Sequence, residues 1–376
     1  MAYIKRHIEE TLLEAASEGC GLTLCGPHMA GKRTTLERLF PGREIMSAEG
    51  YTDALRIEGT SPDAGEKTFR LLGLSMRELA GDDFREPFIP AEEYLSRRNT
   101  KIRYDDSKLE DRFDLLADVM RGCLPVLRTE EKYTRVPSRD FNSYRIFDKR
   151  DGAILYAIFW NELVDEYRDR LVQEGVPSAA AANYFLYIRA FFCYSNPPDY
   201  DWYSSMTKEP VENIKSLFER FAKDDLVWIL RPLEENTSRP VDPAHKVHYL
   251  DSGMAVNLAA QRQSDYSGQL WPEYFQSYII SEIVKSYCNT GITPELYHFR
   301  DPDSEAEVDL VMRFGNDLYP IRIDNGREPF EESLEYLNSF RSFYRKYNVH
   351  DGAVICWARE PYRADRHNIV IPFTYI

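Results

Sequence analysis

Apolar residues recur at helical spacing in several segments of this chain, and they predict helices there. Within residues 209–225, Ile214, Leu217, Phe218 and Phe221 fall on one helical face. The run 154–162 also favours a helix over a strand, because its apolar positions follow helical spacing and no turn residues bound it. The expected helices are residues 3–18, 34–40, 76–80, 91–97, 108–120, two long helices within 152–195, 209–225, 271–288 and 330–347.

Shorter apolar runs bounded by turn residues predict strands between these helices. A helix at 209–225 followed by two strands that flank a polar loop indicates a winged helix, shortened at its front. After residue 268 the pattern becomes α/β, and Gly315-Asn316 is expected to join two strands as a hairpin. The expected strands are residues 22–25, 44–46, 68–72, 226–233, 247–250, 296–299, 307–314, 318–323, 353–357 and 369–373.

The segment 21–39 is the stretch whose sequence points most directly to chemistry. A buried strand leads into a loop bracketed by Gly26 and Gly31, and the loop ends in Lys32 at the start of a helix. Backbone N–H groups, the helix dipole and a lysine together make a cradle for phosphate oxygens. The sequence therefore predicts a P-loop. The candidate nucleotide-binding residues are Gly26, Pro27, His28, Met29, Ala30, Gly31, Lys32, Arg33 and Thr34.

Arg33 departs from the P-loop pattern, which has Ser or Thr after the lysine as a ligand of Mg²⁺. We therefore expect the loop to hold ATP, ADP or phosphate without magnesium. Arginine binds phosphate with two hydrogen bonds, so Arg33 can replace the charge of the metal. In the alternative, Arg33 points to solvent or pairs with Glu37, four residues further on.

The acid that a nucleotide hydrolase needs is also missing. Such enzymes hold Mg²⁺ and polarise water with an acidic residue at the end of an apolar strand, and the first hundred residues contain no such strand. The end of the run 154–162, Asn161-Glu162, imitates the motif on a segment that we expect to be helical. The acids that remain as unusual metal ligands are Glu44, Glu49 and Asp53.

Composition limits the classes of partner. The 376 residues are 43% hydrophobic, which suits two or three domains with buried cores. The formal net charge of −15 opposes non-specific binding to nucleic acid, which depends on neutralising phosphates. The chain begins with a charged amphipathic segment rather than a signal peptide, and no apolar run reaches membrane-spanning length. We therefore expect a cytoplasmic protein without a membrane segment.

Six cysteines, at positions 20, 25, 123, 193, 288 and 356, form no Cys-x-x-Cys pair. The histidines add no metal-ligand spacing to them. Reduced thiols in the core are the expected state, and a zinc site is not expected.

The order of these motifs resembles a prokaryotic family of AAA-type ATPases. In this family an N-terminal P-loop domain is joined through a winged helix to a C-terminal domain similar to PD-(D/E)XK nucleases. The resemblance covers nearly the whole chain and implies an α/β fold in four parts: a truncated P-loop NTPase-like domain (1–85), a helical region (86–200), a winged-helix-like part (201–255) and a nuclease-like domain (256–376). It is carried by Arg6 with Leu12, Gly26-Pro27, Gly31-Lys32 and residues 74–79, 246–253, 275–285, 298–309 and 320–321.

The nuclease-like part departs from the motif that the resemblance implies, which is an Asp followed by Glu-x-Lys on the next strand. There the two acids would bind a divalent metal and the lysine would steady the attacking water. Asp309 matches the first acid, but Arg322 and Asp324 stand at the Glu and Lys positions, and Gln276 stands at a helix glutamate. Strand alternation places 322 and 324 on one face, so Arg322 should lie beside Asp309, where it would repel a metal by roughly 1–4 kcal/mol. Glu282 lies further along the same predicted helix as Gln276, but on another face. A metal held by Asp309 and Asp324 alone is the alternative.

These departures predict a degenerate AAA ATPase/nuclease-like protein that does not hydrolyse nucleotide, can bind nucleotide or phosphate, and acts through protein partners. The first alternative is an active ATPase with unusual metal ligands, coupled to DNA handling. The second is a DNA-binding regulator that uses the winged helix. The exposed face of residues 209–225 mixes lysine and arginine with acids, which opposes the last hypothesis.

Overall fold

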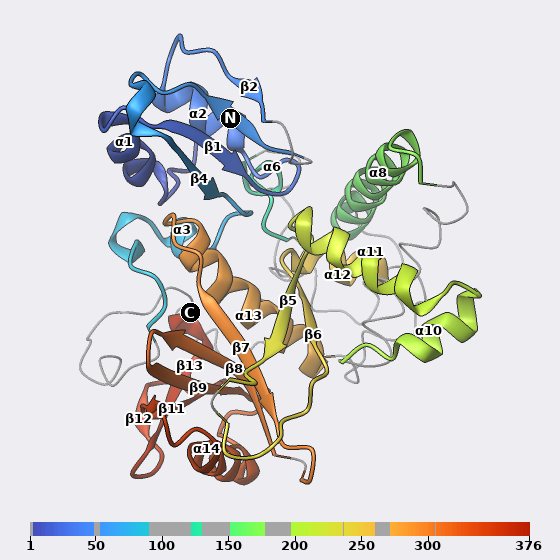
Figure 1. Ribbon diagram of the computed structural model, residues 1–376, viewed down its shortest axis with the longest axis vertical. Helices are drawn as coiled ribbons and strands as arrows, with labels where there is room; N and C mark the ends of the chain where they lie inside the picture. The colour runs from blue at the N-terminus through green and yellow to red at the C-terminus, as the bar shows by residue number, and fades with distance from the viewer. Residues whose placement is uncertain are drawn as a thin grey trace.

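The computed structural model describes residues 3–48, 53–89, 122–129, 151–176, 197–235, 237–259, 271–304 and 306–376. They form a mixed α/β protein with one four-stranded and one nine-stranded sheet. In Figure 1 the small sheet lies at one end of the molecule with the N-terminus, and the large sheet fills the other end, with α3 and α13 between them. The mixed α/β class predicted from the sequence is confirmed.

The small sheet is built around β1, which is buried along its whole length. β1 pairs in parallel with β4 and antiparallel with β3, and the strand order is β2-β3-β1-β4. The apolar helix positions Ile8, Leu12 and Leu36 pack against Leu22 and Leu24 in one core. Its elements are α1 (Glu9–Ser17), β1 (Gly21–Cys25), α2 (Lys32–Leu39), β2 (Met46–Ser47), β3 (Leu55–Ile57), the 3₁₀ helix η1 (Pro62–Ala64) and β4 (Glu66–Arg70).

The sequence prediction for this sheet is confirmed in its order, with two differences. The first helix begins at Glu9 rather than at residue 3. Residues 3–6 lie outside it, and the Arg6 side chain there donates hydrogen bonds to Glu78 and to the carbonyl oxygen of Ala30. β3 was not predicted, since three residues of partly polar sequence give no period that can be read from the chain.

The middle of the chain is helical where it is described. The predicted helix at 76–80 is confirmed as α3, and the helix expected for the run 154–162 is confirmed as part of α8. The predicted helices at 91–97 and 108–120, and the second long helix of 152–195, lie outside the described residues. The elements here are α3 (Met76–Ala80), η2 (Asp82–Phe84), α6 (Pro125–Thr129), α8 (Asp151–Gln173) and α10 (Tyr200–Thr207).

The predicted helix and two-stranded hairpin are present as α11 (Val211–Lys223), β5 (Val227–Pro232) and β6 (Lys246–Tyr249). The apolar face of α11, formed by Ile214, Leu217, Phe218 and Phe221, is buried as expected. β5 pairs antiparallel with β6 and, at its end, parallel with β7. The hairpin therefore continues into the large sheet, and the division between 201–255 and 256–376 stays a prediction.

The large sheet combines an antiparallel meander, β7-β8-β9, with parallel strands β9, β11 and β13. Strand alternation sends Leu310 and Met312 to the face covered by α13, and Val311 to the face covered by α14. The predicted strands and the hairpin at Gly315 are confirmed. The elements are α12 (Ser252–Ala259), α13 (Trp271–Cys288), β7 (Glu295–Arg300), β8 (Glu307–Phe314), β9 (Asp317–Ile323), α14 (Glu331–Phe343), β10 (Asn348–Val349), β11 (Gly352–Cys356), β12 (Tyr362–Arg363), β13 (Asn368–Pro372) and η5 (Phe373–Tyr375).

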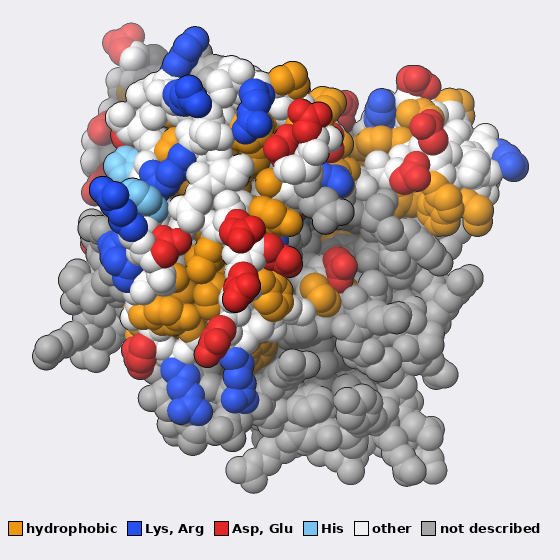
Figure 2. Space-filling model, turned by 90° about the horizontal axis from the view of Figure 1, so that it is seen from below, with side chains coloured by type: hydrophobic (Ala, Val, Ile, Leu, Met, Phe, Trp, Pro, Cys, Tyr) orange, Lys and Arg blue, Asp and Glu red, His pale blue; other side chains and the backbone are white. Residues whose placement is uncertain are grey.

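The described cysteines, all but Cys193, are free thiols. Within the described ranges no helix has the length and apolar character to cross a membrane. Figure 2 shows basic and acidic side chains interspersed on the face seen from below, around patches of hydrophobic side chains.

Candidate functional site

The loop from Gly26 to Thr34, here called the glycine loop, connects β1 to α2. Gly26 has φ +147°, and a Cβ there would lie 1.9 Å from the carbonyl oxygen of Leu71. Gly31, with φ +91°, is the N-cap of α2. Both glycines that bracket the loop in the sequence are therefore required by its backbone.

Lys32 is turned back onto the glycine loop. Its Nζ donates hydrogen bonds to the carbonyl oxygens of Gly26 (2.8 Å) and Pro27 (2.7 Å), and its side chain is only 4% exposed. Burial lowers the pKa of Lys32, and the nearby charges of Asp53 and Asp225 oppose that shift. The lysine charge is thus compensated within the protein, and a bound phosphate would have to compete with two carbonyl groups and two acids.

Asp53 is the acid that lies beside this lysine. Its Oδ2 is 3.6 Å from Lys32 Nζ and 3.1 Å from His28 Nδ1. Burial acts to raise the pKa of Asp53, but the hydrogen bond with His28 and the charge of Lys32 lower it overall. Of the three acids considered as unusual metal ligands, Glu44 is exposed and Glu49 lies outside the described residues. Only Asp53, among those described, has the position that the active-ATPase hypothesis needs.

Arg33 adopts the second of the two arrangements considered from the sequence. Its side chain is 58% exposed, and Nη1 lies 3.6 Å from Glu37 Oε1, one helical turn further on. Thr34 and Met29 are exposed as well. The side chain of Arg33 is therefore free to reorganise towards a ligand, since an exposed pair at i,i+4 is worth only about 0.5 kcal/mol.

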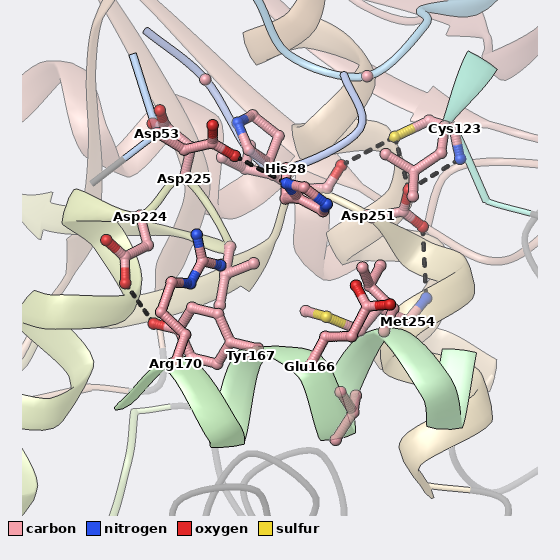
Figure 3. A pocket seen from close by; sticks show the side chains of 18 of the residues that line it. His28, Asp53, Cys123, Glu166, Tyr167, Arg170, Asp224, Asp225, Asp251 and Met254 are labelled. Atoms are coloured by element: carbon pink, nitrogen blue, oxygen red, sulfur yellow. Dashed lines mark hydrogen bonds and ion pairs between the residues drawn. The ribbon is translucent and has the colours of Figure 1, made fainter. Parts of the chain in front are cut away.

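A cavity of about 250 Å³ lies beside the glycine loop. Figure 3 shows Glu166, Tyr167 and Arg170 projecting into this region from α8, opposite His28 and Asp53. The cavity leaves no signal in the sequence, because its walls come from β1, α8, α11 and α12, which only the fold brings together. Its lining includes Trp160, Leu163, Met254, Asp224 and Asp225 in addition to residues of the loop.

Asp225 joins the end of α11 to the small sheet. Its Oδ1 lies 3.0 Å from Arg70 Nε, and its side chain is buried. It has φ +56°, a left-handed conformation that Asp tolerates better than most residues. Burial raises the pKa of Asp225 to about 6, against the opposing charges of Arg70 and Lys32.

Replacing Asp225 with Asn should change how stability depends on pH. The folded chain keeps the Asp225 proton at pH values where the unfolded chain has released it, so the wild type should lose stability as pH rises from about 4 to about 6. The Asn variant lacks this loss, and the difference in unfolding free energy between the two proteins should shift by about 2–3 kcal/mol over that range. Urea denaturation at several pH values measures it, and two parallel pH profiles would contradict it.

Two of the residues that the sequence matched to a nuclease motif, Asp309 and Arg322, lie in a second cluster, around Asp309 on β8. Arg322 Nη1 lies 3.0 Å from Asp309 Oδ1, and Gln276 Nε2 donates to the same oxygen at 2.7 Å. The backbone N–H of Ile323 donates to Oδ2 at 2.8 Å, and the side chain of Asp309 is 1% exposed. Arg322 is therefore beside Asp309, as the resemblance implied.

Lys246 and Glu307 complete this cluster, and sequence analysis did not single them out. Lys246 Nζ donates to Glu307 Oε1 and lies 3.9 Å from Asp309 Oδ1. Burial raises the pKa of Asp309 above its usual value, while Lys246 and Arg322 outweigh burial at Glu307 and lower the pKa of that group. The i,i+2 spacing of Glu307 and Asp309 was the available signal, but Lys246 reaches them only through the β5-β6 hairpin.

Asp324 follows the end of β9 and accepts hydrogen bonds from residues at the start of α14. Its Oδ2 accepts from the backbone N–H of Phe330 and its Oδ1 accepts from Ser333 Oγ, both at 2.8 Å. Glu282 is also committed elsewhere, since it accepts from Met76 N and from Lys285 Nζ. Across the part of the chain that is described, no three or more His, Cys, Asp or Glu side chains are arranged to hold a metal ion.

Comparison with protein-family models gives a match to the C-terminal region. A family model described as a domain of unknown function (DUF4143) matches residues 273–376, which run from α13 to the end of the chain. Neither a curated protein nor a solved structure matches the chain. The matched region contains Gln276, Asp309, Arg322 and Asp324, and the glycine loop lies outside it.

Proposed function

We propose that this chain is a degenerate AAA-type ATPase with a nuclease-like C-terminal domain, which binds nucleotide or phosphate without hydrolysing it and acts through protein partners. The observation that carries the proposal is the Arg322–Asp309 pair. A nuclease of the type that the sequence resembles needs a divalent metal at that carboxylate. Here the Arg322 guanidinium and the Gln276 amide already hydrogen-bond to the buried Asp309 carboxylate, so a metal would have to displace a partly buried cation from it.

The glycine loop supports the binding half of the proposal. The first N–H groups of a helix have no partner within the helix, and α2 begins at Gly31-Lys32 in the loop. These groups and the helix dipole attract an anion, and Arg33 is exposed next to them. The loop offers no hydroxyl ligand at position 33, so we expect binding that does not depend on Mg²⁺.

The purified 376-residue chain should turn over neither ATP nor DNA above the buffer control, with Mg²⁺ or with Mn²⁺. By calorimetry, ADP should bind equally well with and without EDTA, because no step of binding uses a metal. Lys32→Ala should abolish that binding, whereas Lys67→Ala, which removes an exposed lysine of β4, should leave it unchanged. Hydrolysis at rates typical of AAA ATPases, lost in Lys32→Ala, would overturn the proposal. An affinity that falls at least tenfold with EDTA would overturn the metal-free part.

The position of Asp53 favours a second candidate, an active ATPase in which Asp53 replaces the missing strand acid. A carboxylate 3.6 Å from the lysine of the glycine loop is near where a metal and an attacking water would lie. If this candidate is right, Mg²⁺-dependent ATP hydrolysis should be lost in Asp53→Asn and kept in Glu44→Gln, which changes an exposed acid.

A nucleic-acid function receives less support from the surface. The exposed residues of α11 include Glu212 and Glu219 together with Lys215, so the helix offers no one-sidedly basic face. A DNA-binding regulator would retard duplex DNA in a gel at low salt, where phosphate contacts are strongest. We expect no retardation.

A further inference from the structure

Arg6 connects the glycine loop to α3. Its Nη1 donates to the carbonyl oxygen of Ala30 at 2.7 Å, and its Nε donates to Glu78 Oε1 at 2.8 Å. Its Nη2 donates to the carbonyl oxygen of Leu72 at 2.7 Å, and the residue is 2% exposed. A Cβ added at Gly31 would lie 3.6 Å from Arg6 Nη1, so the guanidinium rests against the peptide that starts α2.

Asn289 connects the same carboxylate to the C-terminal region. It directly follows α13 and is fully buried. Its Nδ2 donates to Glu78 Oε2 at 2.8 Å and to the carbonyl oxygen of Gly73 at 2.9 Å, and its Oδ1 accepts from Leu72 N at 2.9 Å. One carboxylate therefore joins Arg6, which holds the loop, to the end of α13.

The fixed carbonyl determines the direction of a neighbouring N–H. The Ala30–Gly31 peptide is planar and trans, so its C=O and N–H point in opposite directions. Arg6 binds the carbonyl, and the N–H of Gly31 is thereby held facing away from Arg6. Donors fixed before a ligand arrives bind it with less loss of conformational freedom.

We infer that Arg6 is a positioning residue for the glycine loop, and that Glu78 and Asn289 make the anion affinity of the loop depend on the packing of α13. This inference rests on the proposed function, since it assumes that the loop binds phosphate groups. By linkage, an anion bound at the loop strengthens the packing of α13 by the same factor. The region matched by the DUF4143 model thereby sets the affinity of a site that lies outside it.

Asn289→Ala in the full chain tests the inference, with inorganic pyrophosphate as the calorimetric probe. We expect affinity about 5- to 20-fold lower than that of the wild type, which is the lower part of the range of an ordinary coupling between sites. Thr11→Val is the matched control: Thr11 Oγ1 donates to the carbonyl oxygen of Thr290 at 3.1 Å across the same interface, without reaching the loop. Thr11→Val should lower the melting temperature but not the affinity.

The double variant Arg6→Gln/Asn289→Ala distinguishes one connected path from two independent effects. It should bind pyrophosphate no more weakly than Arg6→Gln alone, because the two changes interrupt the same connection. Equal affinities of Asn289→Ala and Thr11→Val would overturn the inference and leave the proposed function standing. A wild type that binds neither pyrophosphate nor ADP would overturn the proposed function itself.

Discussion

Replacing Arg6 with methionine should lower the free energy of unfolding by about 3–5 kcal/mol, the usual cost of removing one partner from a buried ion pair. Methionine keeps much of the side-chain volume but leaves the Glu78 carboxylate, which is fully buried, without its cation. The carbonyl groups of Ala30 and Leu72 also lose a donor. Urea denaturation at neutral pH measures the change.

Lys5→Met is the matched control for Arg6→Met, because Lys5 forms an exposed pair with Asp82. It should cost less than about 1 kcal/mol. Equal costs for the two variants would contradict the importance of burial at Arg6.

The effect of Arg6→Met should also depend on pH. Burial acts to raise the pKa of Glu78, but Arg6 holds it below its usual value. The stability from this carboxylate is therefore present above its unfolded pKa and is lost as pH falls through the folded one. Without Arg6, burial raises the Glu78 pKa instead, so the deficit of the variant should begin to narrow as pH falls from neutral towards about 4 and should narrow further below it. A constant deficit would indicate that lost packing, rather than charge, causes the destabilisation.

Gly26→Ala should destabilise the small sheet by about 3 kcal/mol or more, through backbone strain and overpacking together. The new Cβ would lie 1.9 Å from the carbonyl oxygen and 2.9 Å from the carbonyl carbon of Leu71, which are backbone atoms and cannot rotate away. Leu71 N also donates to the carbonyl oxygen of Cys25, so movement of Leu71 would break the contact that holds the start of the loop. ADP binding should be lost at the same time.

Gly42→Ala separates crowding from backbone conformation. Gly42 has φ +82°, but a Cβ there would meet nothing within 4 Å. Its cost should be about 1–2 kcal/mol, the price of a left-handed conformation for an L-residue. Thermal or urea denaturation compares the two variants, and a Gly26→Ala protein as stable as Gly42→Ala would show that the loop can move away from Leu71.

Local periodicity was sufficient to place most elements, because long regular segments carry their own signal. α13 has the predicted bounds, and the hairpin of β8 and β9 turns at Gly315 as expected. β3 escaped prediction because its pairing with β1, and not its own three residues, makes it a strand. Its partner strand lies too far along the chain for any local pattern to show the contact.

Some features of the candidate sites could be expected from the sequence, and others depend on contacts that only the fold makes. The glycine loop follows from local spacing, and the Arg322–Asp309 pair follows from the motif that the resemblance implied. Lys246 reaches Asp309 from another strand, Asp53 reaches Lys32 across a loop, and Asn289 reaches Glu78 over 211 positions of sequence. The sequence alone determined which residue types stand at the two motifs. Only the tertiary structure decided which charges compensate the charged residues of these motifs. A buried charge takes its partner from whichever segment the fold brings within hydrogen-bonding distance.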